Sequence, residues 1–177
     1  MTPDVTLPIE GGFVRPLREA DVHPGYVNGL NDPLVNRFLD AVKAAPQTIE
    51  SVRAFVAADA SSPSSVLWGV FAAGRESHVG TVRLHGIEHR HGIAHIGVCL
   101  FDRGVWGEGL GSRAIAAVTR WAIDSLKLRW VEAGAYEANA ASRRAFESAG
   151  YDWVFDIPGK YLFEGQPTTV KVYAARP

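Results

Sequence analysis

The alternation of apolar and polar positions along the chain predicts strands with a few helices between them. Residues 79–87 and 93–100 alternate, and the polar segment 88–92 between them predicts a hairpin turn. Residues 66–73 are apolar on both faces, which is typical of a central strand. Further strands are predicted at 13–17, 130–136, 151–157 and 170–174.

Helices are predicted where apolar residues recur at helical spacing. The segment 112–126 shows this spacing, with Ile115 and Val118 on its apolar face. Thr48 is placed to cap another helix. Further helices are predicted at 19–30, 33–39 and 140–148. The predicted order is a strand, then helices, then a meander of strands, and finally strands that alternate with helices. This order predicts a mixed α/β sheet in a single domain, residues 1–177.

Composition and charge narrow the class of protein. The chain has 177 residues, with 18 Lys and Arg against 19 Asp and Glu, and a formal net charge of −1. This balance argues against a nucleic-acid binder, which needs a basic surface. The single cysteine, Cys99, excludes an intramolecular disulfide and a thiolate zinc site within one chain. No apolar run reaches about 18 residues and no signal-peptide pattern is present, so a cytoplasmic protein without a membrane span is predicted.

A glycine-rich turn is the segment that most clearly indicates a ligand-binding site. It follows a predicted strand, opens a predicted helix, and contains Gly107, Gly109 and Gly111. Glycines permit close backbone approach and the N–H groups of a helix start attract an anion, so a phosphate site is predicted from Gly107 to Ser112. The dinucleotide fingerprint needs a glycine where Ser112 stands, and the P-loop needs a lysine where Leu110 stands. The alternative is a glycine-rich connection that binds no ligand.

Three segments, in order along the chain, share the pattern of one enzyme family. They are the segment 106–112 (Trp-Gly-Glu-Gly-Leu-Gly-Ser), the segment 139–151 (which begins Asn-Ala-Ala-Ser), and the start of the chain at 14–21 and 30–37. The first resembles the acetyl-CoA pyrophosphate loop of the GNAT superfamily of N-acetyltransferases, with Trp106 at the usual Gln or Arg position. The whole pattern is most similar to the branch with ribosomal-protein N-terminal and amino-sugar acetyltransferases.

This resemblance implies a fold and a co-substrate. The fold is a mostly antiparallel mixed sheet of six to seven strands, splayed in the middle and flanked by about four helices. The co-substrate is acetyl-CoA, with no metal ion, and its pantetheine arm lies in the splay between the strands 93–100 and 130–136. The amide of Val98 or Leu100 would polarise the thioester carbonyl. The cofactor-binding residues implied are Val98, Cys99, Leu100, Trp106, Gly107, Glu108, Gly109, Leu110, Gly111, Ser112, Asn139 and Ser142.

Acetyl transfer to an amine needs a neutral amine and a proton for the departing thiolate. Many relatives carry a tyrosine four residues after the motif serine, where this chain has Phe146, which has no proton to donate. Ser142, Asn139 and Tyr136 remain as candidates for the acid. Helix capping is the favoured role of Asn139, whereas capping and catalysis both stay open for Ser142. Cys99 is interpreted as a small buried residue and not as a nucleophile.

The predicted hairpin has one apolar and one polar face. With the turn centred on Arg90, the strand register puts Arg83, His85 and His95 on the polar face. These three residues are predicted to bind the acceptor, and Glu88, His85 or His95 is a candidate base. The alternatives are a face open to solvent or one covered by a helix. The histidines near this turn are not spaced for a metal site.

The predicted function is acetyl transfer from acetyl-CoA to a primary amine by direct attack in a ternary complex. Arg83 suits a negatively charged or hydroxyl-rich acceptor, so an amino sugar or a peptide N-terminus ranks above a polyamine. The alternatives are a non-catalytic acyl-CoA-binding or sensor module, and an acetyltransferase acting on an aminoglycoside or a polyamine. The protein is predicted to be a monomer or a homodimer.

Overall fold

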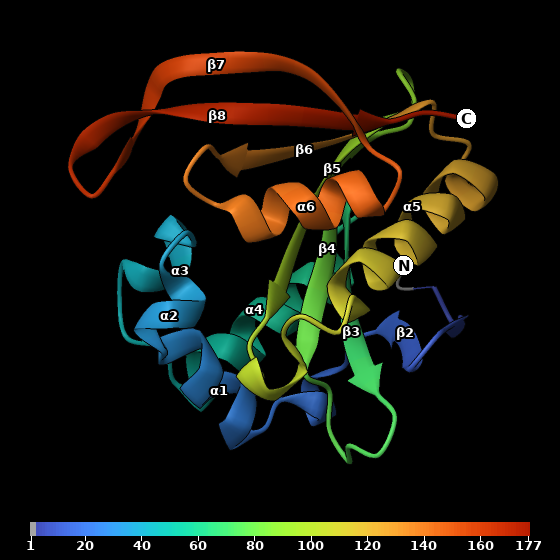
Figure 1. Cartoon of the computed structure of the whole chain (residues 1–177). Coiled ribbons are helices and arrows are strands. Elements are labelled where there is room, and N and C mark those ends of the chain that lie inside the picture. Colours follow the sequence, from blue (N-terminus) through green and yellow to red (C-terminus); the bar gives the residue numbers. More distant parts are fainter. Residues whose placement is uncertain (1–2) are drawn as a thin grey trace.

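One mixed sheet dominates the computed structural model, which describes residues 3–177 (Figure 1). Within these residues the sheet has eight strands in the order β1-β2-β3-β4-β5-β6-β8-β7, and only β5 and β6 pair in parallel. The strands are β1 (Leu7–Ile9), β2 (Gly12–Pro16), β3 (Ser65–Ala72), β4 (Gly80–Glu88), β5 (Ile93–Leu100), β6 (Trp130–Tyr136), β7 (Asp152–Phe163) and β8 (Gln166–Ala175).

Helices lie against both faces of this sheet (Figure 1). Those in the described part of the chain are α1 (Pro24–Asn31), α2 (Pro33–Asn36), α3 (Asp40–Lys43), α4 (Ile49–Ser61), α5 (Leu110–Leu126) and α6 (Ala140–Ser148). The predicted mixed α/β fold is confirmed, but the sheet has more strands, and more helices flank it, than the six to seven strands and about four helices predicted.

The elements that were not predicted are short: the strand β1 and the helix α3. Some predicted elements also have different bounds in the structure. Pro24 lacks the N–H that a helix interior requires, so the predicted helix 19–30 divides into a short 3₁₀ turn and α1, which begins at Pro24. The predicted strand 151–157 continues to Phe163, and its partner begins at Gln166. Together β7 and β8 form a long hairpin that extends past β6, with its tip above α3 in Figure 1.

The predicted register of the β4–β5 hairpin is confirmed. His85 lies opposite His95, and Arg83 lies opposite Gly97. One face of this hairpin carries Val82, Leu84, Ala94 and Ile96, which pack into a core with α5. The sequence pattern therefore placed the side chains on the correct faces from Gly80 to His85. Between His85 and Glu88 a β-bulge, which was not predicted, shifts the register, so that Glu88 lies opposite Ile93.

The opposite face of the sheet carries a second apolar core. Leu67 and Phe101 pack there against Val27 of α1 and against Val52 and Val56 of α4. α4 begins as predicted, because the Thr48 hydroxyl accepts a hydrogen bond from the Ser51 N–H at 3.1 Å. Helices therefore cover part of the face for which an acceptor site, open solvent and a covering helix were the alternatives.

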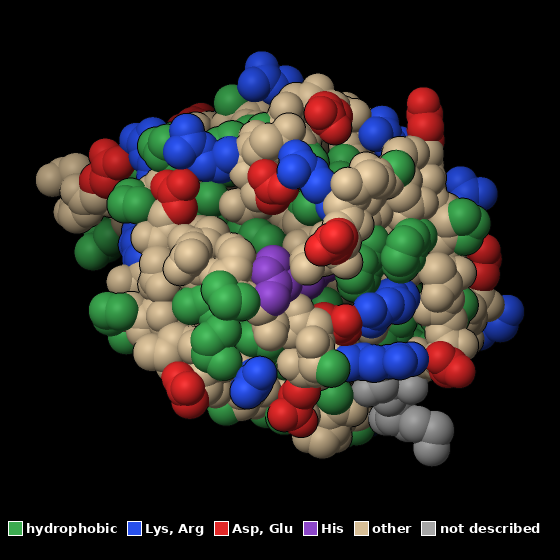
Figure 2. Space-filling model, turned by 90° about the horizontal axis from the view of Figure 1, so that it is seen from below, with side chains coloured by type: hydrophobic (Ala, Val, Ile, Leu, Met, Phe, Trp, Pro, Cys, Tyr) green, Lys and Arg blue, Asp and Glu red, His purple; other side chains and the backbone are tan. Residues whose placement is uncertain are grey.

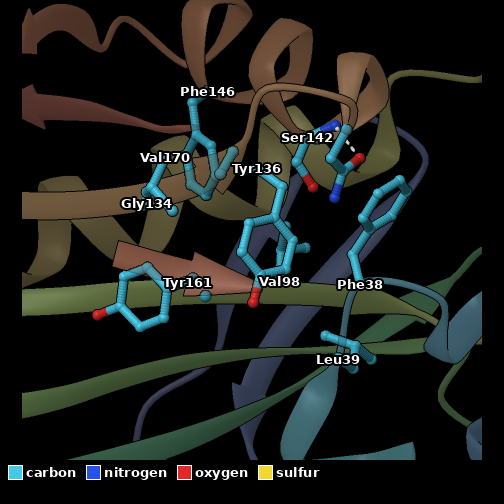
Figure 3. Close-up of a pocket in the computed structure, with 12 residues that line it drawn as sticks. Phe38, Leu39, Val98, Gly134, Tyr136, Ser142, Phe146, Tyr161 and Val170 are labelled. Atoms are coloured by element: carbon cyan, nitrogen blue, oxygen red, sulfur yellow. Dashed lines mark hydrogen bonds between the residues drawn. The ribbon is translucent and has the colours of Figure 1, made fainter. Parts of the chain in front are cut away.

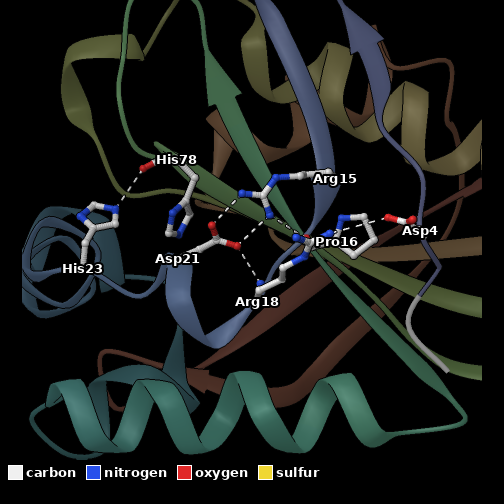
Figure 4. Close-up of polar contacts among 7 residues, drawn as sticks. All are labelled: Asp4, Arg15, Pro16, Arg18, Asp21, His23 and His78. Atoms are coloured by element: carbon white, nitrogen blue, oxygen red, sulfur yellow. Dashed lines mark hydrogen bonds and ion pairs between the residues drawn. The ribbon is translucent and has the colours of Figure 1, made fainter.

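A buried histidine lies where β2, α1 and the β3–β4 connection meet (Figure 4). His78 is 2% exposed, and within the described residues neither of its ring nitrogens has a hydrogen-bond partner. The rings of His23 and Tyr26 stand edge-on to it at 4.9 and 4.8 Å. Arg15 donates two hydrogen bonds to Asp21 beside it, at 2.7 and 2.6 Å. Burial, reinforced by the nearby His23, lowers the pKa of His78 to about 3, so the ring is neutral near pH 7.

The surface shown in Figure 2 carries acidic and basic side chains interspersed with each other. This arrangement agrees with the net charge of −1. Among residues 3–177 no helix combines the length and apolarity needed to span a bilayer.

Candidate active site

The two central strands β5 and β6 separate part-way along their length. Their parallel pairing ends at His95, opposite Glu132. β6 nevertheless stays paired with β8 as far as Tyr136. The predicted splay of the sheet is confirmed, and it opens a gap beside the second half of β5.

Backbone amides of β5 face this gap. The Phe101 N–H donates to the Val79 carbonyl at 3.1 Å, which identifies a hydrogen-bonded pair of the β4–β5 ladder. Because such pairs alternate along an antiparallel ladder, the N–H groups of Val98 and Leu100 point away from β4 and into the gap. The Leu100 carbonyl accepts a hydrogen bond from the Trp106 indole at 2.8 Å, so Trp106 fastens the following loop to the strand end.

α5 begins at this gap with uncapped backbone N–H groups. Gly107 and Gly109 have φ values of 82° and 74°, in the left-handed region that favours glycine. Gly109 is the N-cap residue, and no side chain caps the first turn. The N–H groups of Leu110, Gly111 and Ser112 are therefore free to bind an anion, which the helix dipole also attracts.

A cavity of about 480 Å³ joins the start of α5 to the gap; we call it the larger cavity. Glu108 is the one predicted cofactor-binding residue that does not line it. Its carbonyl accepts a hydrogen bond from Arg113 at 2.9 Å. Arg144 and Ser148 of α6 also line this cavity, and they were not among the predicted residues. The predicted residues that line it are Val98, Cys99, Leu100, Trp106, Gly107, Gly109, Leu110, Gly111, Ser112, Asn139 and Ser142.

A second cavity of about 320 Å³, the smaller cavity, opens on the other side of the gap (Figure 3). None of the residues that line it is charged. It shares part of its lining with the larger cavity, so the two cavities meet. The shared residues are Phe38, Leu39, Val98, Asn139 and Ser142. The smaller cavity is completed by Gly97, Gly134, Ala135, Tyr136, Phe146, Tyr161 and Val170.

The start of α6 places Ser142 where the two cavities meet. Asn139 is the N-cap, and its side-chain oxygen accepts a hydrogen bond from the Ser142 N–H at 3.1 Å (dashed in Figure 3). The capping role favoured for Asn139 is therefore confirmed. Within the described residues the Ser142 hydroxyl has no protein hydrogen-bond partner. Phe146, one turn later, is 2% exposed and apolar.

Tyr136, at the end of β6, extends into the smaller cavity with its hydroxyl end turned away from Ser142 (Figure 3). The Tyr136 hydroxyl donates to the Asp40 carboxylate at the start of α3. Lys43 contacts the other oxygen of that carboxylate at 2.6 Å. Burial and the Asp40 charge raise the pKa of Tyr136 to about 12, and the Lys43 and Tyr136 hydrogen bonds lower the pKa of Asp40. Near pH 7 Tyr136 is therefore protonated and Asp40 is ionised.

The tip of the β7–β8 hairpin contacts the segment between α2 and α3. The rings of Phe38 and Phe163 stack with centroids 4.9 Å apart. Arg37 pairs with Glu164 at 2.9 Å. Glu164 itself adopts a left-handed φ of 52° in the turn. Segments more than a hundred residues apart in the sequence thus form one wall beside the smaller cavity.

Arg83, predicted to bind the acceptor, lies outside both cavities. Its Nε donates to Asp59 of α4 at 2.7 Å, and its guanidinium lies 5.0 Å from the Phe55 ring centroid. The Asp59 side chain is only 1% exposed and also accepts from the Ser65 hydroxyl at 2.9 Å. Arg83 therefore neutralises a buried carboxylate. Asp59 belongs to α4, so at Arg83 the polar face of the hairpin is covered by a helix, which was one of the alternatives to an acceptor site.

His85, His95 and Glu88 also lie outside the cavities. The His85 and His95 rings stack 5.6 Å apart near the far end of the hairpin. Glu88 is the last residue of β4, next to the hairpin turn, and its carboxylate accepts from the Arg90 N–H at 2.9 Å. The structure does not bring these candidate bases to the gap. Across residues 3–177, no three His, Cys, Asp or Glu side chains are grouped to hold a metal ion.

Cys99 belongs to the lining of the larger cavity, but its thiol is packed against the second core. Burial raises the pKa of the thiol to about 12. A thiol, unlike a thiolate, is a weak nucleophile. This agrees with the interpretation of Cys99 as a small buried residue.

Solved structures of acetyltransferases share this fold. An acetyltransferase (GNAT family) from Bacillus anthracis superposes with a TM-score of 0.82 at 19% identity, covering 97% of this chain and 98% of that one. The same figures hold for a ribosomal L7/L12 α-N-protein acetyltransferase in complex with coenzyme A. A spermidine N-acetyltransferase from Vibrio cholerae, in complex with CoA and spermine, gives 0.81 at 15% identity, covering 94% and 96%.

The sequence itself identifies the family. Residues 13–152 match the acetyltransferase (GNAT) domain, so the chain belongs to the GNAT acetyltransferase family. A search of the curated proteins gave no match. The predicted family resemblance is confirmed.

Proposed function

We propose that this protein transfers the acetyl group of acetyl-CoA to a primary amine by direct attack, without a covalent enzyme intermediate. The observation that supports this most is the meeting of two cavities at the β5–β6 gap. The larger cavity leads from the free N–H groups of α5, which suit a pyrophosphate, to the amides of Val98 and Leu100. The smaller cavity then gives an amine access to the same point.

Each residue at the gap has a chemical task in this proposal. The amide of Val98 or Leu100 donates to the thioester oxygen as negative charge develops there. The amine nitrogen bonds to the carbonyl carbon, the carbon–sulfur bond breaks, and the sulfur takes the proton of the Ser142 hydroxyl. The nitrogen, now positively charged, gives up one proton, and that proton restores the Ser142 hydroxyl, so the products are a neutral amide and the free CoA thiol. Tyr136 is not the acid in this proposal, because its proton is held by Asp40 and its hydroxyl end points away from Ser142.

The acceptor proposed here is a primary amine that fits a cavity without charged side chains: a small amine, an amino sugar or a peptide N-terminus. Arg83 no longer supports ranking a negatively charged acceptor first, because it pairs with Asp59 outside the cavities. The uncharged lining of the smaller cavity offers no cation for a nucleotide phosphate. The aromatic side chains Phe38, Tyr136 and Tyr161 provide flat apolar surfaces for the carbon skeleton of the acceptor.

Binding of CoA by a loop variant tests the cofactor site. We expect Gly109→Asp to reduce CoA affinity at least about a hundred-fold in calorimetric titration, since the carboxylate faces the pyrophosphate at the helix start. Gly74→Asp is the matched control. Gly74 has nearly the same φ, 75° against 74°, and open space around it, but it lies in the β3–β4 connection. Equal CoA affinity in the two folded variants would remove the glycine-rich turn from the cofactor site.

Thiol release tests the activity itself. The wild-type protein is mixed with acetyl-CoA and, in turn, glucosamine, a peptide with a free N-terminus, and spermidine. We expect amine-dependent release of free CoA thiol with at least one of them. CoA binding without thiol release from any amine would favour an acyl-CoA-binding module.

A further inference from the structure

The smaller cavity contains few polar side-chain groups that can touch an amine. Asn139 uses its side-chain oxygen to cap α6. The Ser142 hydroxyl is assigned to the departing sulfur. Tyr136 and Tyr161 carry the remaining polar groups of the lining. The orientation of an amine in this cavity therefore depends on very few atoms.

The hydrogen bond to Asp40 fixes the orientation of the Tyr136 hydroxyl. An ionised carboxylate only accepts hydrogen bonds, so the single hydroxyl proton of Tyr136 points at Asp40. The lone pairs of Tyr136 Oη are consequently left for the cavity. Asp40 is itself held by Lys43, is about half-exposed, and lines neither cavity. Tyr136 therefore presents a hydrogen-bond acceptor, and not a donor, to whatever enters.

A primary amine that attacks a thioester needs its lone pair directed at the carbonyl carbon, while its N–H groups need acceptors. The ring of Tyr136 lies in the smaller cavity close to Val98, whose amide faces the gap (Figure 3). A hydrogen bond from the amine N–H to Tyr136 Oη would hold the nitrogen beside the carbonyl and fix the direction of its lone pair. As the new bond forms, the nitrogen gains positive charge, and this hydrogen bond becomes stronger.

We propose that Tyr136 accepts a hydrogen bond from the acceptor amine and that Asp40 is a positioning residue which keeps the Tyr136 hydroxyl in this orientation. This inference rests on the proposed function and adds to it the residue that holds the amine. It also makes the Tyr136–Asp40 pair a determinant of acceptor specificity. A tertiary amine has no N–H to offer and would not be held.

Steady-state kinetics of four variants test the pair, with the best acceptor among glucosamine, the peptide and spermidine. Tyr136→Phe keeps the ring and removes the oxygen. We expect its kcat/KM for the amine to fall about ten- to a hundred-fold, as for loss of a hydrogen bond to a charged group. Asp40→Ala should lower kcat/KM in the same direction. Tyr136→Phe combined with Asp40→Ala should match Tyr136→Phe alone, because Asp40 acts only through Tyr136.

Tyr173→Phe is the matched control, because Tyr173 also donates to a carboxylate, that of Glu147, at 3.0 Å, and lines neither cavity. Its kinetics should stay within about two-fold of wild type. CoA affinity should be unchanged in every variant, which separates an effect on the amine from one on the cofactor. Wild-type kinetics in Tyr136→Phe, or additive losses in the double variant, would overturn the inference and leave the proposed function standing. No thiol release by the wild type with any amine would overturn both.

Discussion

Replacing Arg83 by alanine should destabilise the protein and leave acetyl transfer intact. The Asp59 carboxylate is 1% exposed, and Arg83 is its only charged partner among the described residues. One Asp59 oxygen has no hydrogen-bond partner at all within them. Breaking a buried ion pair from one side costs about 3–5 kcal/mol, because a buried charge is left uncompensated. Arg83 is itself 39% exposed, so the expected loss is about 3 kcal/mol, at the lower end.

Urea and thermal denaturation measure this loss. For a chain of this length, about 3 kcal/mol corresponds to a fall in Tm of about 6 to 12 °C. Asp59→Asn in the Arg83→Ala background should recover part of the loss, because no buried charge then remains. Arg176→Ala is the control. Arg176 pairs with Asp152 at 3.3 Å with both side chains more than half exposed, and such pairs contribute about 0–1 kcal/mol.

Kinetics decide between the two roles considered for Arg83. If it only neutralises Asp59, KM for the amine and kcat stay at wild-type values below the melting temperature. A loss of stability below about 1 kcal/mol, together with a raised KM for the amine, would refute the structural reasoning. It would also restore the hairpin face as an acceptor surface.

Two further predictions concern Ser142 and His78. Ser142→Ala should lower kcat by about ten- to a thousand-fold in the thiol-release assay, and a change below about two-fold would rule out Ser142 as the acid. His78 binds a proton below about pH 6.5 only when the chain unfolds, since its pKa in the folded state is about 3. Unfolding free energy should therefore fall by about 2 kcal/mol from near pH 7.5 to about pH 5. His78→Phe should remove this dependence; an unchanged pH profile in urea titrations would contradict the assignment.

Local patterns in the sequence predicted much of the central sheet. Alternation gave the faces of β4 and β5, because a one-residue slip would have moved Val82 and Leu84 out of the core. Capping chemistry identified the starts of α4 and α6, because Thr48 and Asn139 satisfy N–H groups within their own first turns. These features depend on residues that are neighbours in the chain, so a single sequence contains their signal.

The acceptor side could not be predicted in the same way. Phe38 and Tyr161 line one cavity although they lie on opposite halves of the chain, and neither belongs to a recognisable motif. Asp59 reads as a polar position on a helix, and only packing against β4 shows that it needs Arg83. The strands of the β7–β8 hairpin are longer than their apolar segments predict. The outer half of the hairpin extends beyond the rest of the sheet, where no core imposes an apolar pattern.

The interruption of the sheet explains why backbone, and not side chains, carries so much of the proposed chemistry. Had β5 and β6 stayed paired beyond His95, the amides of Val98 and Leu100 would have been used in the ladder. The separation leaves them without a strand partner and opens the point where the two cavities meet. The N–H groups at the start of α5 are also left without a partner, because the N-cap residue, Gly109, has no side chain to accept a hydrogen bond from them. The side chains that must then be supplied are few: a hydroxyl for the sulfur from Ser142, and an acceptor for the amine from Tyr136.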